Sequence, residues 1–379
     1  MRSIFRKLRR SRFSYKPLVE VFIYASALRH NYSFFQNRKQ GLSVAPVLKS
    51  NAYGHGLVNV AQVVDTLSAP FLAVDSYFEA LVLRNEGIRS PLLVIGYTPQ
   101  ENIERSRLKK IFFTIVSLDE LEVLSRTLSV SRTFHLKVDT GMRRQGIGCA
   151  DISKAALLVK KNPNIILDGL CSHFADADGQ STVFTREQIQ KWNEAVRFFR
   201  KEFPALSYYH ISQTAGVEYA QECDANVLRL GLGLYGMTTN PREDDQLLRP
   251  ALEMRSILAT LRQISSGEKV GYNITFQAER NMKIATVPVG YYEGIDRRLS
   301  SKGSFMIGDT PCPIVGRVSM NITSIDVSAV SSAKLGMPVT IISSQKKDAN
   351  SVEQFAVLCG AIPYELLVRI PSQLRRTLV

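Results

Sequence analysis

Cysteine is scarce in this sequence, and the few cysteines are scattered. The 379 residues include Cys149, Cys171, Cys223, Cys312 and Cys359, and no two of them form a CxxC pair. An odd, dispersed set argues against a disulfide framework and against structural zinc, and it favours a reducing compartment. Long apolar runs are missing too, since none approaches the ~18–20 residues of a membrane span. We therefore expect a cytoplasmic protein without a membrane span.

Acidic residues are fewer than basic ones. The chain has 48 lysines and arginines against 34 aspartates and glutamates, a formal net charge of +14. Seven positive charges precede the first acid, Glu20, so half of the excess lies in a basic tail over residues 1–16. The tail lacks the apolar core of a secretory signal, which argues against export. No RNA-recognition, helix-turn-helix or zinc-finger pattern accompanies it, so we expect no nucleic-acid partner. The role of the tail stays open.

Short apolar runs alternate with stretches of helical periodicity up to about residue 245. Apolar strands between helices predict a parallel sheet covered on both sides. Eight such units over roughly 200 residues favour an α/β fold, a (β/α)8 TIM-like barrel, which we assign to residues 17–245. A dinucleotide-binding sheet is the alternative, but no GxGxxG follows the first run. The eight runs are 43–50, 71–76, 91–96, 112–117, 134–141, 165–173, 206–212 and 227–236.

Two predicted helices of this region carry clear signals. In residues 76–87 the spacing places Phe78, Leu81 and Val82 on one apolar face. The next helix begins at Ser117, because Glu120 follows three residues later in a capping-box pattern.

The pattern changes after Arg249–Pro250. Short apolar strands follow one another, separated by turns such as SSGEK and GDTP, and helices are few. We therefore predict a C-terminal, mainly β domain over residues 246–379. One late helix is expected to open at Ser351 and to close at Gly360.

Polar side chains gather where the predicted barrel strands end, which is where barrels of this kind place their chemistry. The group is basic and poor in acids, which suits an anionic ligand. A desolvated lysine at such an end can become a nucleophile and form a Schiff base, although a core-edge lysine that reaches solvent is the structural alternative. Paired carboxylates and metal-ligand spacing are both missing, so we expect neither a glycosidase nor a metal site. The strand-end residues are Lys49, Tyr53, Lys137, Asp139, Arg144, His173, Ser212 and Arg229.

At these positions the sequence resembles the alanine racemase family, fold-type III enzymes that use pyridoxal 5'-phosphate. The resemblance runs from about Pro17 onward, and its motifs occur in the family's order. Many motifs in register are far more specific than any one of them. They are PVLKSNAYGHG, HLKVDTGMRRQG, SHFADAD, VLRLGLGLYG, KVGYNITF, VGYYEG, VGRVSMN and IPYELL.

The resemblance implies a two-base reaction. Lys49 binds the cofactor covalently and then acts as the base on one face of the substrate α-carbon. Tyr272 acts on the opposite face and comes from the β domain of a second subunit, so a homodimer with shared sites is implied. Racemisation needs one base on each face, which a Lys–Tyr pair supplies. Arg229 faces the pyridine nitrogen without giving up its proton, and His173 links Arg229 to Tyr272.

The resemblance also assigns the binding residues. Arg144 and the backbone at Met320 receive the substrate carboxylate, and Tyr291 lies in the entrance region. Lys137 orients Arg144, in the family often as a carbamate, which a sequence does not reveal. The phosphate is held by Tyr53, Thr214, Gly231, Leu232 and Tyr364.

Five positions depart from the family pattern and leave turnover and side-chain preference open. Arg143 replaces the usual glycine beside Arg144, although the Arg-x-Gly spacing favours Arg144 as the working arginine. Gln213 and Thr214 replace Asn-Ser, and Thr214 keeps the hydroxyl. Glu293 replaces an aspartate, and Asn321 replaces the acid after Met320.

The function that these motifs imply is an alanine racemase that interconverts L- and D-alanine and supplies D-alanine for peptidoglycan. A broad-specificity racemase or a fold-type III decarboxylase is the alternative, although the decarboxylases place an acid where this chain has Arg229. A non-catalytic protein that carries the cofactor is a further alternative. Such carriers resemble the barrel alone, so the β domain with Tyr272 argues against it. For His55 we expect a structural role, and for Asp139 and Thr140 a turn or helix cap.

Overall fold

The computed structural model describes residues 15–38, 41–239 and 246–379, so the predicted basic tail lies outside it except for residues 15 and 16. The chain divides into two compact units. The barrel unit comprises the described parts of 23–252 together with 362–368 and 378–379, and the β unit comprises 15–22, 253–361 and 369–377. Residues 17–22, which the sequence assigned to the barrel, thus fall in the β unit, because their strand pairs with strands of that unit.

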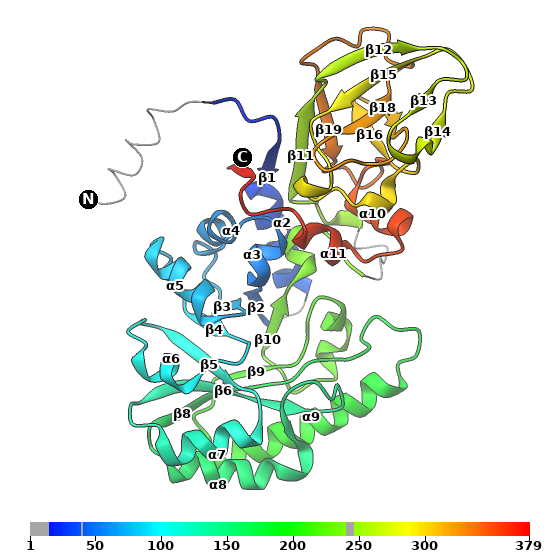
Figure 1. Cartoon of the computed structure of the whole chain (residues 1–379). Coiled ribbons are helices and arrows are strands. Elements are labelled where there is room, and N and C mark those ends of the chain that lie inside the picture. Colours follow the sequence, from blue (N-terminus) through cyan, green and yellow to red (C-terminus); the bar gives the residue numbers. More distant parts are fainter. Residues whose placement is uncertain (1–14, 39–40, 240–245) are drawn as a thin grey trace. The chain divides into compact units, whose positions relative to one another are not determined.

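The described part of the barrel unit contains eight parallel strands, paired in the orders β10-β2 and β3-β4-β5-β6-β8-β9 (Figure 1). Strand β10 pairs in parallel with β2, and a bridge between Val47 and Ala73 joins β2 to β3. The Asn226 N–H donates to the Tyr209 carbonyl at 3.0 Å and joins β9 to β10. Each predicted run contains or overlaps one of these strands, so the expected (β/α)8 barrel is confirmed. They are β2 (Ser43–Pro46), β3 (Leu72–Val74), β4 (Leu92–Val94), β5 (Ile111–Ile115), β6 (Arg132–Asp139), β8 (Ile165–Cys171), β9 (Tyr208–His210) and β10 (Val227–Leu230).

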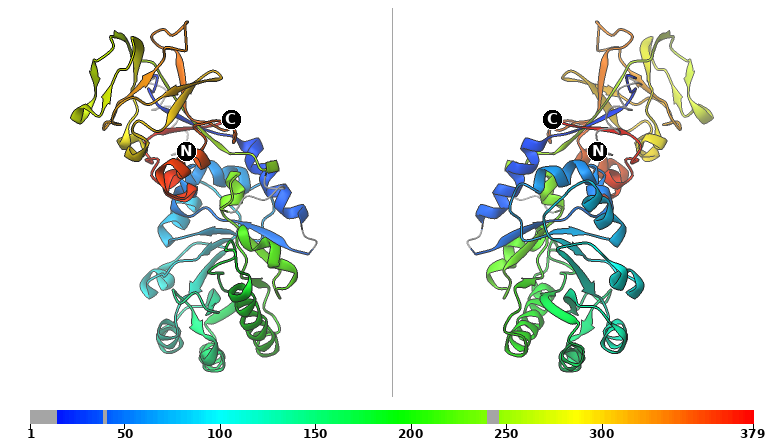
Figure 2. Two further views of the ribbon diagram at one scale, coloured as in Figure 1. Left: turned by 90° about the vertical axis from the view of Figure 1, so that its right-hand side faces the viewer. Right: turned by 90° about the vertical axis from the view of Figure 1, so that its left-hand side faces the viewer.

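Helices lie outside the strands of this unit, as two further views show (Figure 2). The apolar spacing is confirmed as helical in 76–87, but the expected face is wrong: Phe78 is 72% exposed, whereas Ala80 and Leu83 are buried. The inward stripe of that helix thus follows residues 80 and 83, one turn apart. The helices are α2 (Ala25–Arg38), α4 (Leu57–Val64), α5 (Tyr77–Asn85), α6 (Gln100–Arg105), α7 (Leu118–Thr127), α8 (Ile152–Lys161), α9 (Val183–Glu202) and α11 (Pro363–Val368).

The N-terminal cap of α7 is confirmed, since the Ser117 hydroxyl accepts the Glu120 N–H at 3.1 Å. The Glu120 carboxylate in turn accepts the Val116 N–H at 2.8 Å. Burial raises the pKa of Glu120 to about 7, although the hydrogen bond from Val116 opposes that shift. A carboxyl in the unfolded chain has a pKa of about 4.3.

Because folding tightens the hold of Glu120 on its proton, we expect stability to depend on pH at this residue. Its contribution is fully present below pH ~4.3 and is lost as the pH rises through about 7, up to about 4 kcal/mol. Glu120→Gln keeps an acceptor oxygen and should remove this component. Urea unfolding of both proteins at about pH 5 and pH 8 measures it. Identical changes with pH in the two proteins would assign the dependence to other groups.

The β unit contains a six-stranded sheet in the order β17-β16-β19-β11-β1-β20 and a three-stranded sheet in the order β12-β15-β18. The predicted mainly β domain is thereby confirmed as a fold. Its described strands are β1 (Glu20–Ile23), β11 (Leu252–Ile257), β12 (Thr260–Ile264), β13 (Lys269–Val270), β14 (Phe276–Gln277), β15 (Met282–Val287), β16 (Ser304–Ile307), β17 (Thr310–Pro313), β18 (Thr323–Asp326), β19 (Pro338–Ile342) and β20 (Arg375–Leu378).

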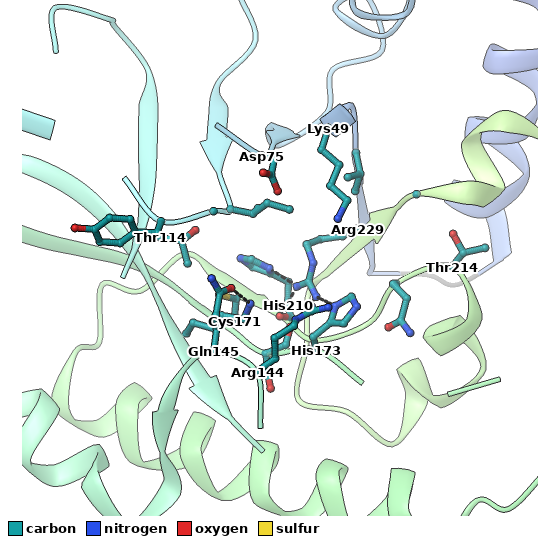
Figure 3. Close-up of a pocket in the computed structure, with 18 of the residues that line it drawn as sticks. Lys49, Asp75, Thr114, Arg144, Gln145, Cys171, His173, His210, Thr214 and Arg229 are labelled. Atoms are coloured by element: carbon teal, nitrogen blue, oxygen red, sulfur yellow. Dashed lines mark hydrogen bonds between the residues drawn. The ribbon is translucent and has the colours of Figure 1, made fainter. Parts of the chain in front are cut away.

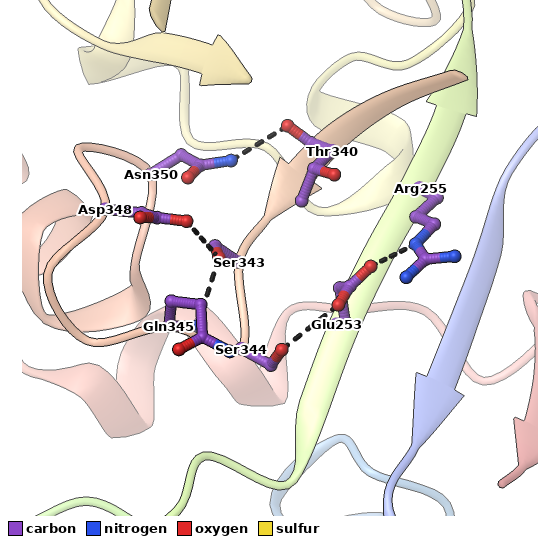
Figure 4. A network of polar contacts seen from close by, with 8 residues as sticks. All are labelled: Glu253, Arg255, Thr340, Ser343, Ser344, Gln345, Asp348 and Asn350. Atoms are coloured by element: carbon purple, nitrogen blue, oxygen red, sulfur yellow. Dashed lines mark hydrogen bonds and ion pairs between the residues drawn. The ribbon is translucent and has the colours of Figure 1, made fainter. Parts of the chain in front are cut away.

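One helix of the β unit, α10 (Val352–Cys359), has the predicted ends: the Ser351 hydroxyl accepts the Gln354 N–H at 3.3 Å, and Gly360 is left-handed. A polar network beside it ties β11 to β19 and to the loop before α10 (Figure 4). In it Glu253 accepts from Arg255 and from the Ser344 hydroxyl. Asp348 accepts from Ser343 at 2.7 Å, and Asn350 donates to the Thr340 carbonyl at 2.8 Å. These bonds stabilise the β unit and form no cavity of their own.

No described helix combines the length and the apolar character that a membrane crossing requires.

Candidate active site

A cavity of about 650 Å³ opens at the carboxyl ends of the barrel strands (Figure 3). All of its described lining residues belong to the barrel unit. The side chains of Lys49, Arg144, His173 and Arg229 point toward the same space (Figure 3). The expected residues found in the lining are Lys49, Tyr53, Lys137, Arg144, His173, Thr214, Arg229, Gly231 and Tyr364.

Several expected residues lie elsewhere. Leu232 is buried beside Gly231 and is not part of the described lining. Ser212, a predicted strand-end residue, is likewise buried outside the lining. Asp139 forms the expected turn, since it accepts the N–H groups of Gly141 at 2.9 Å and Arg143 at 3.1 Å.

Other lining residues were missed by the sequence, although most of them also end a barrel strand or follow one directly. The strand-end rule covers Asp75, Cys171, Ser172 and His210, whereas Gln145 follows no barrel strand directly. Asp75 is the one carboxylate among the described lining residues. The missed polar residues include Asp75, Tyr97, Thr114, Gln145, Cys171, Ser172 and His210.

A left-handed turn follows Lys49. Ser50, Asn51, Ala52 and Tyr53 all have φ between +52° and +56°. For residues other than glycine this conformation costs roughly 1–2 kcal/mol each. A strained turn directly after the half-buried Lys49 is the kind of outlier that clusters at functional sites.

Neighbouring groups hold this turn in place. The Asn51 side chain accepts the Leu57 N–H at 2.8 Å, and the Asn51 N–H donates to Glu79 at 3.3 Å. Gly54 packs directly against the Leu367 carbonyl in α11, a contact that leaves no space for a side chain. His55 is buried and its Nδ1 lies 3.1 Å from the Tyr53 carbonyl, which is consistent with the structural role expected for it.

Three hydroxyl side chains and one glycine surround a small open space in the cavity, which we call the cradle. They are Tyr53, Thr214, Tyr364 and Gly231. A side chain at Gly231 would come within 3.0 Å of the Tyr53 hydroxyl and 4.0 Å of the Thr214 hydroxyl, so the glycine keeps this space open. Burial raises the pKa of Tyr364 to about 12 and the pKa of Tyr53 further, so both phenols stay protonated and can donate. The Thr214 hydroxyl oxygen accepts the Gly233 N–H at 3.1 Å, which leaves its proton for another acceptor. Neutral donors around an open space suit a compact anion.

The Arg229 guanidinium makes five hydrogen bonds to described residues, and all five acceptors are neutral. It donates to the carbonyls of Ser172, His210 and Ile211 at 2.6, 2.7 and 2.9 Å. It also meets Nδ1 of His210 at 2.6 Å and Nδ1 of His173 at 3.1 Å. None of these five contacts uses Nε. Burial and the charge of Arg229 lower the pKa of His173 well below its usual range, so that ring is neutral and carries its proton on Nε2.

A second cationic group lies beside Arg144. The Lys137 ammonium donates to the Gln145 side chain at 3.1 Å. Burial lowers the pKa of Lys137, and the charges of Arg229, Arg144 and Lys49 add to the effect. Arg143 is exposed, has φ of +56° and is absent from the described lining. The structure thus places Arg144, the arginine that the spacing favoured, at the cavity.

Three expected residues belong to the β unit and are exposed: Tyr272 (67%), Met320 (54%) and Tyr291. Their loops adjoin one another, since the Tyr291 N–H donates to the Ser319 carbonyl at 3.1 Å and Gly271 lies beside Gly316.

The turn that carries Tyr272 is strained. Tyr272–Ile274 connects β13 to β14, and Asn273 and the β-branched Ile274 both have positive φ. Such values are rare for a β-branched residue. Two of the residues that depart from the family pattern are hydrogen-bonded to each other, since Asn321 donates to the Glu293 carboxylate at 2.7 Å.

Comparison with known proteins resolves what this arrangement is. The family described as "Alanine racemase, N-terminal domain" matches residues 23–239, and "Alanine racemase, C-terminal domain" matches residues 251–378. The chain belongs to the alanine racemase family. A relative from Syntrophobacter fumaroxidans, "Alanine racemase", is 35% identical over 356 residues, which are 92% of this chain and 94% of that protein.

Solved structures of the alanine racemase family share this fold. The alanine racemase of Clostridium difficile 630 has a TM-score of 0.88 and 28% identity, with 97% of each chain covered. An alanine racemase from Bacillus anthracis, solved with bound L-Ala-P, has a TM-score of 0.87 and 27% identity, covering 97% of this chain and 96% of that one.

Proposed function

We propose that this protein is a pyridoxal-phosphate-dependent alanine racemase that interconverts L- and D-alanine as a homodimer. The observation that carries the proposal is the cavity that presents Lys49, Arg229 and Arg144 together at the strand ends of a family-matched barrel. We also propose that its D-alanine is used for peptidoglycan and that it works in the cytoplasm. The described cysteines form no disulfide, which fits a reducing compartment.

The residues present fit the cofactor. Tyr53, Thr214, Gly231 and Tyr364 form the cradle of neutral donors that a phosphate requires. Lys49 supplies the amine for covalent attachment, and the backbone at Leu232 adjoins the cradle. Bound pyridoxal phosphate supplies an electron-withdrawing group that acidifies the α-hydrogen of the attached amino acid.

Two residues move protons at the α-carbon. Lys49 holds or accepts a proton at Nζ on one face, and Tyr272 of a second subunit does so at its phenolic oxygen on the other. His173 has its Nε2–H available, because Nδ1 accepts from Arg229. That N–H and the charge of Arg229 stabilise a phenolate at Tyr272.

Arg229 limits the chemistry. A guanidinium donates hydrogen bonds but does not surrender its proton, so Arg229 would donate to a cofactor ring nitrogen without protonating it. This weakens electron withdrawal and favours return of the proton over side reactions. It also argues against the decarboxylase alternative, which requires an acid at this position.

The substrate carboxylate is received by Arg144 and by the backbone at Met320, with Tyr291 in the entrance region. Lys137 supports Arg144 from within the cavity, where Gln145 accepts its hydrogen bond. An acid-poor cavity attracts a carboxylate electrostatically.

The test follows both the reaction and the attachment point. Purified protein loaded with the cofactor should convert L-alanine to a racemic mixture, with much weaker action on L-serine and L-lysine. Borohydride reduction followed by peptide mapping should place the cofactor on the peptide that contains Lys49. Absence of racemisation, or a label on another lysine, would overturn the assignment. Faster turnover of L-serine or L-lysine than of L-alanine would instead identify a broad-specificity racemase.

A further inference from the structure

A second imidazole lies behind the cavity, in the interior of the barrel. His135 on β6 is fully buried. Its ring stacks on Phe112 at 5.2 Å and on Tyr208 at 5.5 Å between ring centroids. Gly169 of the neighbouring β8 makes room for it, because a side chain there would come within 2.6 Å of the imidazole. Position 169 thus accommodates the ring of His135.

The hydrogen bonds of this ring continue to Arg229. Nδ1 of His135 lies 2.8 Å from Nε2 of His210, and Nδ1 of His210 lies 2.6 Å from Nη1 of Arg229. Arginine can only donate, so Nδ1 of His210 is an acceptor and its proton is on Nε2. That Nε2–H donates to Nδ1 of His135, whose own proton is therefore on Nε2. The three side chains form a directed chain from Arg229 through His210 to His135.

The two ring nitrogens of His135 indicate why this position is a histidine. Nε2 of His135 is buried and has no hydrogen-bond partner among the described residues. Leaving a buried polar group without a partner costs about 1–3 kcal/mol. A phenylalanine would fill the same aromatic surroundings without that cost. The compensating interaction is the acceptor at Nδ1, which satisfies His210.

We propose that His135 is a positioning residue for the reaction: it fixes the ring of His210, and through it the guanidinium of Arg229. The proposal rests on the proposed role of Arg229 beside the cofactor. With both histidines neutral, Arg229 is oriented without a carboxylate, and its full positive charge acts on the cavity. Loss of the acceptor at position 135 leaves the His210 Nε2–H unsatisfied and frees its ring to rotate.

Two variants of the cofactor-loaded enzyme separate positioning from packing. His135→Phe keeps a ring between Phe112 and Tyr208 but removes the acceptor. His135→Asn places an amide oxygen near the position of Nδ1 and keeps the acceptor. We expect His135→Phe to lower kcat/KM by about 10–100-fold, as loss of a supporting hydrogen bond does around other catalytic groups. His135→Asn should restore most of the activity.

The decisive measurement does not depend on activity. The chain has only five histidines, so ring-nitrogen NMR with labelled histidine can resolve them. We expect His210 and His135 to show bare Nδ1 and protonated Nε2 in the wild type. The His210 signals should shift or broaden in His135→Phe and return in His135→Asn.

Protonated Nδ1 on either ring would overturn the proposal. So would a His135→Phe variant with unchanged His210 signals and unchanged kcat/KM. If the wild type fails to racemise alanine, the proposed function fails, whereas the nitrogen signals still test the chain of hydrogen bonds.

Discussion

Replacing Lys49 with alanine will abolish racemisation, with a loss of at least ~10⁴ in rate. In the proposed function this residue both attaches the cofactor and acts as one of the two bases, and loss of either role should cost several powers of ten. Because the phosphate cradle does not include Lys49, the variant should still bind the cofactor, now without the covalent link. Lys161→Ala, an exposed change on α8, is the matched control and should keep full activity. Retained turnover in Lys49→Ala would remove the residue from the mechanism.

The same variant tests whether two subunits share a site. Mixing Lys49→Ala with Tyr272→Phe subunits should produce dimers in which one site has both bases. Random pairing of equal amounts predicts about a quarter of the wild-type activity. The exposed loops of Tyr272, Tyr291 and Met320 support this arrangement, since exposed apolar groups mark interaction surfaces. A mixture no more active than its parents would contradict shared sites.

Tyr272→Phe will cost on the order of 10²–10⁴ in racemisation, the span for loss of a positioned acid–base group. In the proposed mechanism the two bases act on opposite faces of a planar centre, so each should remove the α-proton of one enantiomer only. By the family resemblance, Tyr272 acts on L-alanine and Lys49 on D-alanine. Removal of the phenolic oxygen should therefore affect the two directions of proton removal unequally.

Steady-state turnover does not separate these roles, because equilibrium ties the forward and reverse rates together. Single-turnover exchange of the α-proton in D₂O does separate them. With Tyr272→Phe, exchange from D-alanine should persist through Lys49 while exchange from L-alanine collapses. Tyr292→Phe, which removes the hydroxyl of another exposed tyrosine, is the control. Equal loss from both enantiomers would indicate a single base and exclude Tyr272.

The barrel could be predicted from the sequence because its strands are buried on both faces. Such strands must be apolar throughout, and runs such as 91–96 show this directly. The face of α5 was not predictable in the same way. Its short helix carries apolar residues around much of its circumference, so spacing alone misplaced Phe78, and only the packing of Ala80 and Leu83 decided the buried side.

The site was predictable where a polar side chain lies near the carboxyl end of an apolar run, as at Lys49 after β2 and at Arg229 near the end of β10. His210 was missed because the predicted run extends to residue 212, so Ser212 was taken as the strand end, whereas β9 ends at His210. The left-handed turn after Lys49 was not predictable from local preferences, because serine and alanine disfavour that conformation. It exists because Leu57, Glu79 and α11 hold it from outside the segment.

The contact between Gly54 and α11 gives the site an order of completion during biosynthesis. Tyr53 and Gly54 meet Tyr364 and Leu367, residues that lie about 310 positions later in the chain. At typical elongation rates the ribosome needs about 15–60 s to reach them after Gly54. Throughout that interval a nascent barrel lacks one wall of its phosphate cradle and part of the support for its strained turn. Under the proposed function, loading with the cofactor would therefore follow translation of α11 and the packing of residues 362–368 against Gly54.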